Sequence, residues 1–488
     1  MKRNYRIQFI AFLLGHYRAE HNQTGALMRI LRQGRNTQFG KDHQLHKISS
    51  VQDYLQNDLL TGYDDLYPYL QRIMNGEQDV SFKGKPDFMA ITSGTTAYAK
   101  YIPLRRTTIR SFQYGSLVTL INLILETGKL TWGKSLFISP PTIFERSAGI
   151  IVGRIPAILN DQLSDLQKKF IYPTRSVLNI PDNDLRQKAI IEECREAAIT
   201  SISGMPSWLC SFFQQVEALT QLKPIQLWPK LKYLFVGGTS AVKYKDLLSN
   251  TVGKKIDLVS SYIATEGFLG IGCDVNAEQY LLNLKNGTFY EFIPAFPDEN
   301  EPFKKYGIQD VSVGVEYNLV LTDAVGKWSY NVKDVIRFSC LKPYIFEVLG
   351  RSNNEISIAG EHLLEAQVQK AISNVKDQLQ LQGIGISEYI IRGLVTDKGP
   401  THQWAIEIST KNKESIGVLE KLIDGELQKF NYMYKNLRHS NQLKLPEVIA
   451  LSPGTFRKFF VTRQKIERLY KLPAINADPA IWEYIKPN

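Results

Sequence analysis

Residues 88–96 read FMAITSGTT, an apolar run that leads directly into a turn rich in hydroxyl groups. Phe88 to Ile91 are the apolar residues, and Thr92 to Thr96 follow before Lys100. Four hydroxyls around one glycine make a flexible turn with many donors, which suits the oxygens of a triphosphate. For this segment alone, a hydroxyl-rich surface turn is the alternative. The turn is not a Walker loop, and we expect no P-loop fold.

The region around this turn has the pattern of a helix-covered sheet. From Asp87 to about Ile345, short apolar strands such as Leu136 to Ser139 and Tyr233 to Val236 alternate with longer amphipathic stretches. That alternation predicts an α/β fold with parallel strands, whose ligands bind at the carboxyl ends of the strands. Gly237-Gly238 follow one such strand, where a nucleotide or a tight structural turn would each explain them.

The flanking regions differ from this centre. Residues 1–77 show helical periodicity, whereas Gly314 to Phe338 resembles paired strands, which we expect to belong to a small β-barrel portion. After Gly350-Arg351 a compact α+β pattern begins. We therefore predict a large N-terminal domain at 1–349 and a smaller C-terminal domain at 350–488.

The N-terminus imitates a signal peptide, with Lys2-Arg3 before the apolar run Ile7 to Gly15. No small-residue cleavage site follows, so we expect one amphipathic helix that continues through Leu31. No apolar run approaches the length that spans a bilayer, and we expect no membrane partner.

Composition restricts the partners and the compartment. The 488 residues carry a net charge of +11, with the basic residues spread along the chain. Small polyanionic substrates fit that field, whereas a nucleic-acid footprint is not visible. The four cysteines are far apart and show no metal-ligand spacing, so we expect a reducing cytoplasm and no zinc site. We expect a monomer.

Three later segments follow the hydroxyl turn in a familiar order. They are YIATE at Tyr262 to Glu266, YNVKD at Tyr330 to Asp334, and GRSNNEISIAG at Gly350 to Gly360. With the turn, they resemble the TSGTTGxPK, YGxTE, Y(R/K)TGD and GRxDxQVKIxG patterns of the adenylate-forming superfamily. That superfamily contains acyl-CoA synthetases, luciferases and peptide-synthetase adenylation domains. Each pattern is weak alone, but four in order are specific.

Further segments are similar to one branch, the auxin-responsive acyl-acid amido synthetases (Gretchen Hagen family) and their bacterial relatives. The matching segments cover most of the chain and lie at Thr37 to Lys41, Tyr63 to Glu77, Lys100 to Pro103, Met205 to Trp208, Trp328 to Phe338 and Lys471 to Pro473. The resemblance implies an adenylate-forming fold with a mobile C-terminal domain. It also implies a ligase that uses ATP and Mg²⁺ to join a carboxylic acid to an amine, which we expect to be an amino acid.

The resemblance also assigns roles to matching residues. Glu266 would hold Mg²⁺, Asp334 would accept the ribose hydroxyls, and Tyr262 would pack beside adenine. A surface glutamate, an Asp334–Arg337 salt bridge and a core tyrosine are the structural alternatives. The remaining nucleotide-binding candidates are Ser93, Gly94, Thr95, Thr96, Gly238, Thr265 and Arg351.

The C-terminal basic stretch would supply a cation to the α-phosphate. Lys471 matches the terminal motif and Lys465 is the second candidate, whereas a solvated basic helix face is the alternative. Thr95 is the candidate catalytic hydroxyl. The acyl pocket is expected to involve residues scattered over the N-terminal domain, namely Tyr98, Phe144, Met205 and Trp208.

The chain departs from the family patterns at three places. Ala97-Tyr98 stand where relatives have glycine, Lys333 replaces the glycine before the ribose aspartate, and His362 stands where plant relatives place a lysine. These departures leave open a homologue that binds nucleotide or acyl ligands without catalysis. An acyl-CoA ligase with the same first step is the other alternative, because amide formation rests on the branch resemblance alone.

Overall fold

The computed structural model describes most of the chain, as two compact units at Met1–Glu347 and Val348–Asn488. The described residues are 2–92, 100–129, 133–139, 145–147, 149–238, 241, 244–295, 303–351, 355–356, 358–359, 361, 363–380, 384–396, 399–409, 413–439, 443–462, 472–475 and 478–485. The following paragraphs treat each unit by itself.

The chain begins with short helices, as the periodicity of residues 1–77 predicts. They are α1 (Lys2–Leu13), α2 (Ala19–Gly34), α3 (Gln38–Asp42), α4 (Val51–Gln56) and α5 (Tyr63–Met74), with single 3-10 turns at His16–Arg18 and Leu45–Lys47. The prediction of one continuous first helix was wrong, because Gly15 takes a left-handed φ of 90° between α1 and α2. Among the described residues, no helix is long and apolar enough to cross a membrane.

The first unit is built on an eleven-stranded sheet with a parallel half and an antiparallel half. Strands β9, β8, β7, β3 and β6 run parallel, and β9 then pairs antiparallel with β10. The α/β fold class is therefore confirmed. In sheet order the strands are β12 (Phe289–Pro294), β13 (Glu316–Thr322), β14 (Tyr330–Leu341), β15 (Tyr344–Arg351), β11 (Gln279–Leu282), β10 (Gly267–Gly272), β9 (Asp257–Ala264), β8 (Tyr233–Val236), β7 (Ile199–Gly204), β3 (Lys134–Phe137) and β6 (Ile171–Tyr172).

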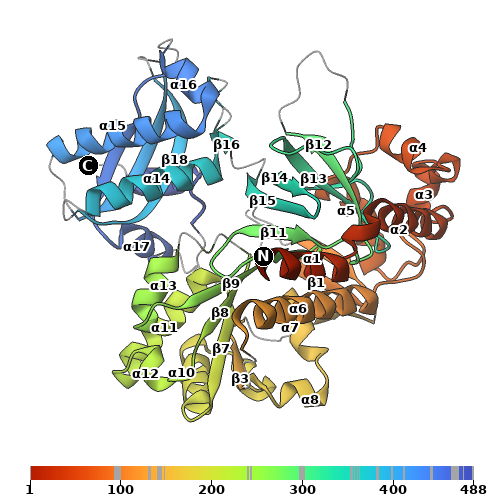
Figure 1. Ribbon diagram of the computed structural model, residues 1–488, viewed down its shortest axis with the longest axis horizontal. Coiled ribbons are helices and arrows are strands. Elements are labelled where there is room, and N and C mark those ends of the chain that lie inside the picture. Colours follow the sequence, from red (N-terminus) through yellow and green to blue (C-terminus); the bar gives the residue numbers. More distant parts are fainter. Residues whose placement is uncertain are drawn as a thin grey trace. The chain divides into compact units, whose positions relative to one another are not determined.

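Helices cover both faces of the parallel half, and the alternation of side chains along β8 shows why. Leu234 and Val236 belong to the core under α10 (Asn183–Cys194), α11 (Pro206–Thr220) and α13 (Lys245–Val252). Tyr233 points to the other face and packs with Leu123. Leu123 belongs to α6 (Arg106–Thr127), which lies along the sheet (Figure 1). A strand buried on both faces is apolar at every position, which is the pattern of Tyr233 to Val236. Smaller helices are α7 (Ile155–Asp161), α8 (Asp165–Lys168), α9 (Arg175–Leu178) and α12 (Pro224–Leu227).

The second unit is an α+β domain with a three-stranded sheet. Strands β18 (Ile386–Thr396), β19 (Gly399–Ile408) and β20 (Glu447–Leu451) form it. Ile391 and Trp404 pack under α14 and α15, whereas Ile390 and Ala405 pack on the opposite face with Phe456. The remaining elements are β16 (Glu355–Ile356), β17 (Leu363–Leu364), α14 (Glu365–Gln380), α15 (Lys413–Phe430), α16 (Tyr432–His439), α17 (Thr455–Thr462) and α18 (Pro479–Tyr484).

His16 joins the N-terminal helices to the antiparallel strands in a neutral form. Its Nε2 donates to the Leu282 carbonyl at 2.7 Å, and its Nδ1 accepts from the Tyr344 amide at 3.0 Å. Burial lowers the pKa of His16 from 6.5 to about 4. The folded protein therefore protonates His16 only at a lower pH than the unfolded chain does. The contribution of neutral His16 to the free energy of unfolding is fully present above pH 6.5 and is lost as the pH falls towards 4.

We predict that this histidine makes acid unfolding steeper. Between pH 7 and pH 5, His16 should remove about 2 kcal/mol from the free energy of unfolding. His16→Gln should lose that part of the pH dependence in urea unfolding, whereas the exposed His21→Gln should keep it. Equal pH slopes for the wild type and His16→Gln would contradict the prediction.

Candidate functional site

The stem of the hydroxyl turn is held by two paired strands. β1 (Phe88–Thr92) and β2 (Lys100–Leu104) run antiparallel, and their last pair is Thr92 with Lys100. The Lys100 ammonium lies 5.2 Å above the ring of Tyr63, whose hydroxyl accepts a hydrogen bond from the Tyr101 amide. These strands form a second sheet with β5 (Ile150–Gly153) and β4 (Glu145–Ser147). The predicted phosphate-binding residues between the strands lie outside the described residues: Ser93, Gly94, Thr95, Thr96 and, beside them, Ala97 and Tyr98.

A Walker pattern, GKLTWGKS, does occur at residues 128–135, but it stands in the wrong structural order. A P-loop connects the end of a strand to the start of a helix, so that the helix N-terminus faces the phosphates. Here Gly128 ends α6 and the lysine and serine begin β3. Lys134 lies against the rings of Phe170 and Tyr172, and Ser135 bonds Ser201 at 2.7 Å. The pattern is therefore structural.

The carboxyl ends of the neighbouring parallel strands β7, β8 and β9 bring predicted site residues to one edge. Met205 follows β7, and Gly238 follows β8 with a left-handed φ of 80°. A Cβ atom on Gly238 would lie 3.6 Å from the Met205 side chain, so these two candidates are adjacent. Thr265 and Glu266 come directly after β9 and are both half-buried. This is the edge at which open α/β sheets bind ligands.

Asp334 lies on a bulge in β14. Asn318 of β13 pairs with Val335 while Val320 pairs with Asn331, so three residues of β14 stand opposite one residue of β13. Lys333, in the middle of these three, has a left-handed φ of 64°, and its amide donates to the Asn331 side chain at 2.7 Å. A bulge of this kind turns the following side chain away from the regular pleat. The glycine of the family pattern suits the left-handed backbone that Lys333 adopts here.

We predict that Lys333→Gly stabilises the protein. A side chain in the left-handed region costs about 1–2 kcal/mol, and glycine removes that cost. The greater backbone entropy of glycine in the unfolded chain offsets about 0.5–1 kcal/mol of the gain. The free energy of unfolding should rise by up to about 1.5 kcal/mol in urea titrations. Lys333→Ala keeps the strain and loses the same side-chain contacts, so it should show no gain. A gain of the same size for alanine would refute the account.

Asp334 meets Tyr262, although their strands are far apart in the sheet. The Tyr262 hydroxyl donates to Oδ2 of Asp334 at 2.5 Å. Four strand steps, through β15, β11 and β10, separate β14 from β9, which is about 19 Å in a flat sheet. The antiparallel half must therefore curl strongly. The pairings among the described strands do not close a ring, so the small barrel remains a prediction.

Among the described residues, Asp334 and Arg337 do not form the salt bridge that was the structural alternative. Arg337 pairs instead with Glu347 at 3.2 Å and with Glu316 at 3.6 Å. The half-buried Asp334 carboxylate is thus directed towards β9, and the guanidinium serves two other carboxylates.

The ring of Tyr262 belongs to an aromatic cluster. Phe346 contacts it edge-on with 5.7 Å between ring centroids, and Tyr280 lies at 6.1 Å. Tyr262 is nevertheless only half-buried, because it stands near the carboxyl end of β9. The ring packing is what the core-tyrosine alternative expects, but the exposed part of the side chain remains accessible to a ligand.

The segment after Arg351 contains a buried pair that local sequence patterns did not reveal. Glu361 and His402 are both fully buried, with 2.7 Å between Oε1 and Nε2. The Glu361 carboxylate also accepts the amides of Ile358 and Ala359, at 3.2 and 2.8 Å. Burial alone would raise the pKa of Glu361, but the hydrogen bond and electrostatic attraction of His402, together with the Ala359 amide, outweigh it and lower the pKa. The two residues are 41 positions apart in the sequence, and no local pattern signals the pair.

The other candidates are placed only in part. Trp208, in the first turn of α11, packs against the core of that face, and its indole N–H has no hydrogen-bond partner among the described atoms. The backbone of Arg351 ends β15. Three candidates, Phe144, Lys465 and Lys471, and the departure His362 lie outside the described residues.

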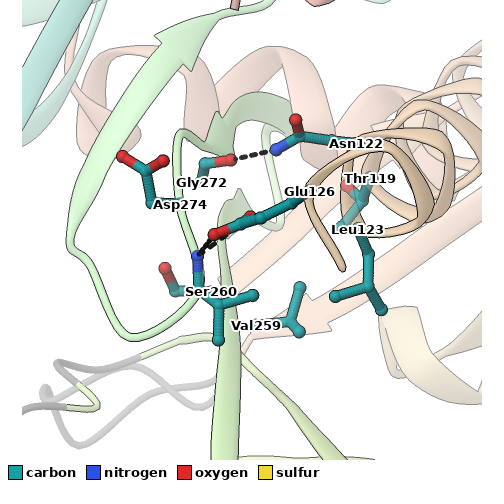
Figure 2. Close-up of a pocket in the computed structure, with 9 residues that line it drawn as sticks. Thr119, Asn122, Leu123, Glu126, Val259, Ser260, Gly272 and Asp274 are labelled. Carbon is teal, nitrogen blue, oxygen red and sulfur yellow. Dashed lines mark hydrogen bonds between the residues drawn. The ribbon is translucent and has the colours of Figure 1, made fainter. Parts of the chain in front are cut away.

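Two hollows in the first unit contain none of the candidate residues. The one in Figure 2 measures about 10 Å³, room for at most one water. Its polar walls, Asn122, Glu126 and Asp274, bind the buried Arg6 of α1 and so dock that helix. An open groove of about 530 Å³ lies elsewhere, lined by His43, Gln44, Leu45, Lys47, Ile48, Asn57, Asp58, Leu59 and Leu60.

Comparisons with known proteins agree with this architecture. Residues 12–189 match the GH3 family N-terminal domain, residues 281–351 the GH3 family central domain, and residues 366–480 the GH3 family C-terminal domain. The chain belongs to the GH3 family. The resemblance to this family, inferred from the further matching segments between Thr37 and Pro473, is thereby confirmed.

Relatives of this GH3 chain match nearly its whole length. The indole-3-acetic acid-amido synthetase GH3.3 of Arabidopsis thaliana is 23% identical, over 92% of this chain and 88% of the relative. The solved GH3.15 acyl acid amido synthetase has a TM-score of 0.79 at 18% identity, covering 98% of this chain and 95% of that one. A 2-hydroxyisobutyryl-CoA ligase in an open conformation has a TM-score of 0.54 at 13% identity, covering 94% and 92%. The adenylate-forming fold is thus confirmed.

Proposed function

We propose that this GH3 family chain joins a carboxylic acid to the AMP part of ATP and then transfers the acyl group to an amine, which we expect to be an amino acid. The observation that carries the proposal is the meeting of Tyr262 and Asp334 across the curled sheet. A carboxylate and a tyrosine at the carboxyl edge of the parallel strands suit a ribose and a base. The relatives' names, indole-3-acetic acid-amido synthetase and acyl acid amido synthetase, support the reaction class.

In this proposal the nucleotide is held from several strands. Asp334 accepts the ribose hydroxyls, Tyr262 packs beside adenine, and the glycine at 238 permits close backbone approach. The phosphates are bound by Ser93, Gly94, Thr95, Thr96, Thr265 and Arg351. Positioning the acid against the α-phosphorus then supplies most of the rate, because a bimolecular step becomes intramolecular.

Glu266 is the residue that we propose to hold Mg²⁺. It stands half-buried in the two-residue turn between β9 and β10, four residues after Tyr262. Mg²⁺ bound to a nucleotide needs only one or two protein carboxylates, with waters and phosphates completing its octahedron. Among the described residues no cluster of three or more potential ligands occurs, so a magnesium site here would depend on the nucleotide. The ion would screen the triphosphate charge and stabilise the leaving pyrophosphate.

The C-terminal unit contributes the remaining groups. We propose that Lys471 or Lys465 reaches the α-phosphate as negative charge develops there. The stretch that carries both lysines is followed by Ala474, whose amide donates to Glu365 at 2.9 Å and whose carbonyl accepts from Ile391 at 2.7 Å. We propose that the domain from residue 350 is mobile, and its compactness as a separate unit supports this.

The acyl pocket and the setting of the enzyme are also proposals. Met205 stands beside Gly238, and Trp208 lies in the first turn of α11. We propose that the acid lies there, next to the nucleotide, with Tyr98 and Phe144 as further lining residues. All four cysteines have free thiols, which supports a reducing cytoplasm. We also propose a monomer, which sedimentation velocity would test.

A screen of acids against amines tests the reaction. Carboxylate-dependent release of pyrophosphate from ATP, followed by an amide product with an amino acid, would support the proposal. A thioester formed with coenzyme A in place of the amide would establish the acyl-CoA ligase alternative, and hydroxamate trapping would show the shared first step. ATP binding without pyrophosphate release over a broad acid panel would establish a non-catalytic homologue.

A further inference from the structure

Tyr262 has a hydroxyl group that stacking beside adenine does not require. That hydroxyl donates to Oδ2 of Asp334 at 2.5 Å, within the short range expected when an O–H group meets a carboxylate. A phenylalanine would present the same ring to a base, so the hydroxyl indicates a second task.

The geometry points to Tyr262 as a positioning residue: it orients the Asp334 carboxylate for the ribose hydroxyls of the nucleotide. This inference rests on the proposed function, because it requires Asp334 to bind ribose. Asp334 needs such support, since it follows the strained Lys333 on a bulge where three residues oppose one and regular strand pairing is lost.

Tyr262 is well placed to give that support. Its ring is packed edge-on against Phe346 and tilted against Tyr280, so the position of the hydroxyl is set by the aromatic cluster and by β9. A ring with two rotatable bonds that is fixed by packing loses little entropy when it holds a partner. Tyr262 thus links the bulged strand β14 to strand β9 and limits the movement of Asp334.

The hydrogen-bond capacity of the carboxylate permits both partners. An ionised carboxylate offers about four lone-pair positions on its two oxygens, and one phenol occupies a single position. A carboxylate that accepts from a phenol can therefore also accept from ribose hydroxyls. The tyrosine contact precedes the nucleotide, so the cost of orienting the carboxylate is met before binding.

The test compares ATP with 2′-deoxy-ATP in equilibrium binding, which does not depend on the chemistry. Calorimetry on the full chain should show that Tyr262→Phe weakens ATP binding about tenfold, because binding must then bear the cost of orienting the carboxylate. With 2′-deoxy-ATP the same substitution should cost only about twofold, because one of the two ribose contacts that it orients is missing. In turnover assays the KM for ATP should rise, whereas kcat should stay within about twofold of the wild-type value.

Tyr280→Phe is the matched control. It removes a phenol hydroxyl from the same aromatic cluster, in which the rings of Tyr280 and Tyr262 lie 6.1 Å apart between centroids. It should leave the ratio of the two affinities unchanged. In an Asp334→Asn background, Tyr262→Phe should have little further effect on either affinity.

Three outcomes would overturn the inference. Equal penalties for ATP and 2′-deoxy-ATP would show that Tyr262 serves the base alone, and unchanged affinity would show that the hydrogen bond has no role in binding. A chain that binds neither nucleotide would overturn this inference and the proposed function together. A chain that binds ATP with the predicted ratios, yet releases no pyrophosphate with any acid, would refute the proposed reaction and retain the positioning role.

Discussion

Replacing Asp334 by alanine is expected to lower kcat/KM for ATP at least a hundredfold. Two hydrogen bonds from ribose hydroxyls to a carboxylate are worth about 1.5–3 kcal/mol each, and their joint loss exceeds the roughly 2.7 kcal/mol of a hundredfold change. Most of the loss should appear in KM, because the ribose contact is made before the chemistry begins. Pyrophosphate release at varied ATP concentration measures both parameters.

Glu316→Ala is the control for the Asp334 prediction. Glu316 lies on the adjoining strand β13 and contacts Arg337, which keeps its shorter ion pair with Glu347. Glu316→Ala should therefore change kcat/KM less than about threefold, as usual for a partly exposed ion pair. Both variants should stay folded, because each site is only half-buried. Turnover of Asp334→Ala within threefold of wild type would exclude the ribose role.

Short-range patterns predicted much of this fold because they reflect local physics. The apolar run at Tyr233 to Val236 indicates a strand covered on both faces, and α10, α11 and α6 supply the covers. Helical periodicity likewise predicted the first 77 residues, although not the break between α1 and α2. The sequence around Gly15 permits either course, and the left-handed backbone there depends on tertiary packing.

The contacts of the candidate site were harder to predict, because they join distant parts of the chain. Tyr262 and Asp334 are 72 residues apart, and only the curl of the antiparallel strands brings them together. Sheet curvature arises from bulges and twist summed over many strands, and no short pattern encodes it. Glu361 and His402 form a buried pair for the same reason, across 41 residues. Local patterns therefore identified the candidate residues, whereas the tertiary fold determines what they touch.

Replacing Glu266 by alanine is expected to reduce kcat about a thousandfold, with a smaller change in the affinity for ATP. Charge stabilisation by a correctly held Mg²⁺ is worth several kcal/mol in the transition state, and about 4 kcal/mol corresponds to a thousandfold. The position supports this role, since the short β9–β10 turn leaves Glu266 little freedom to move away from the carboxyl edge of the sheet.

The dependence on magnesium separates this role from a structural one. Glu266→Ala should require roughly tenfold or more additional free Mg²⁺ for half-maximal pyrophosphate release, and Glu266→Asp should recover part of the rate because it keeps a carboxylate. Asp257→Ala is the control, since this exposed acid begins β9 at the opposite end of the strand from Glu266. A Glu266→Ala enzyme with wild-type magnesium dependence would assign the ion to another residue, even if its rate were low. A rate within threefold of wild type would remove Glu266 from the site, and the hydroxyl turn would then have to bind the phosphates without a protein carboxylate on the metal.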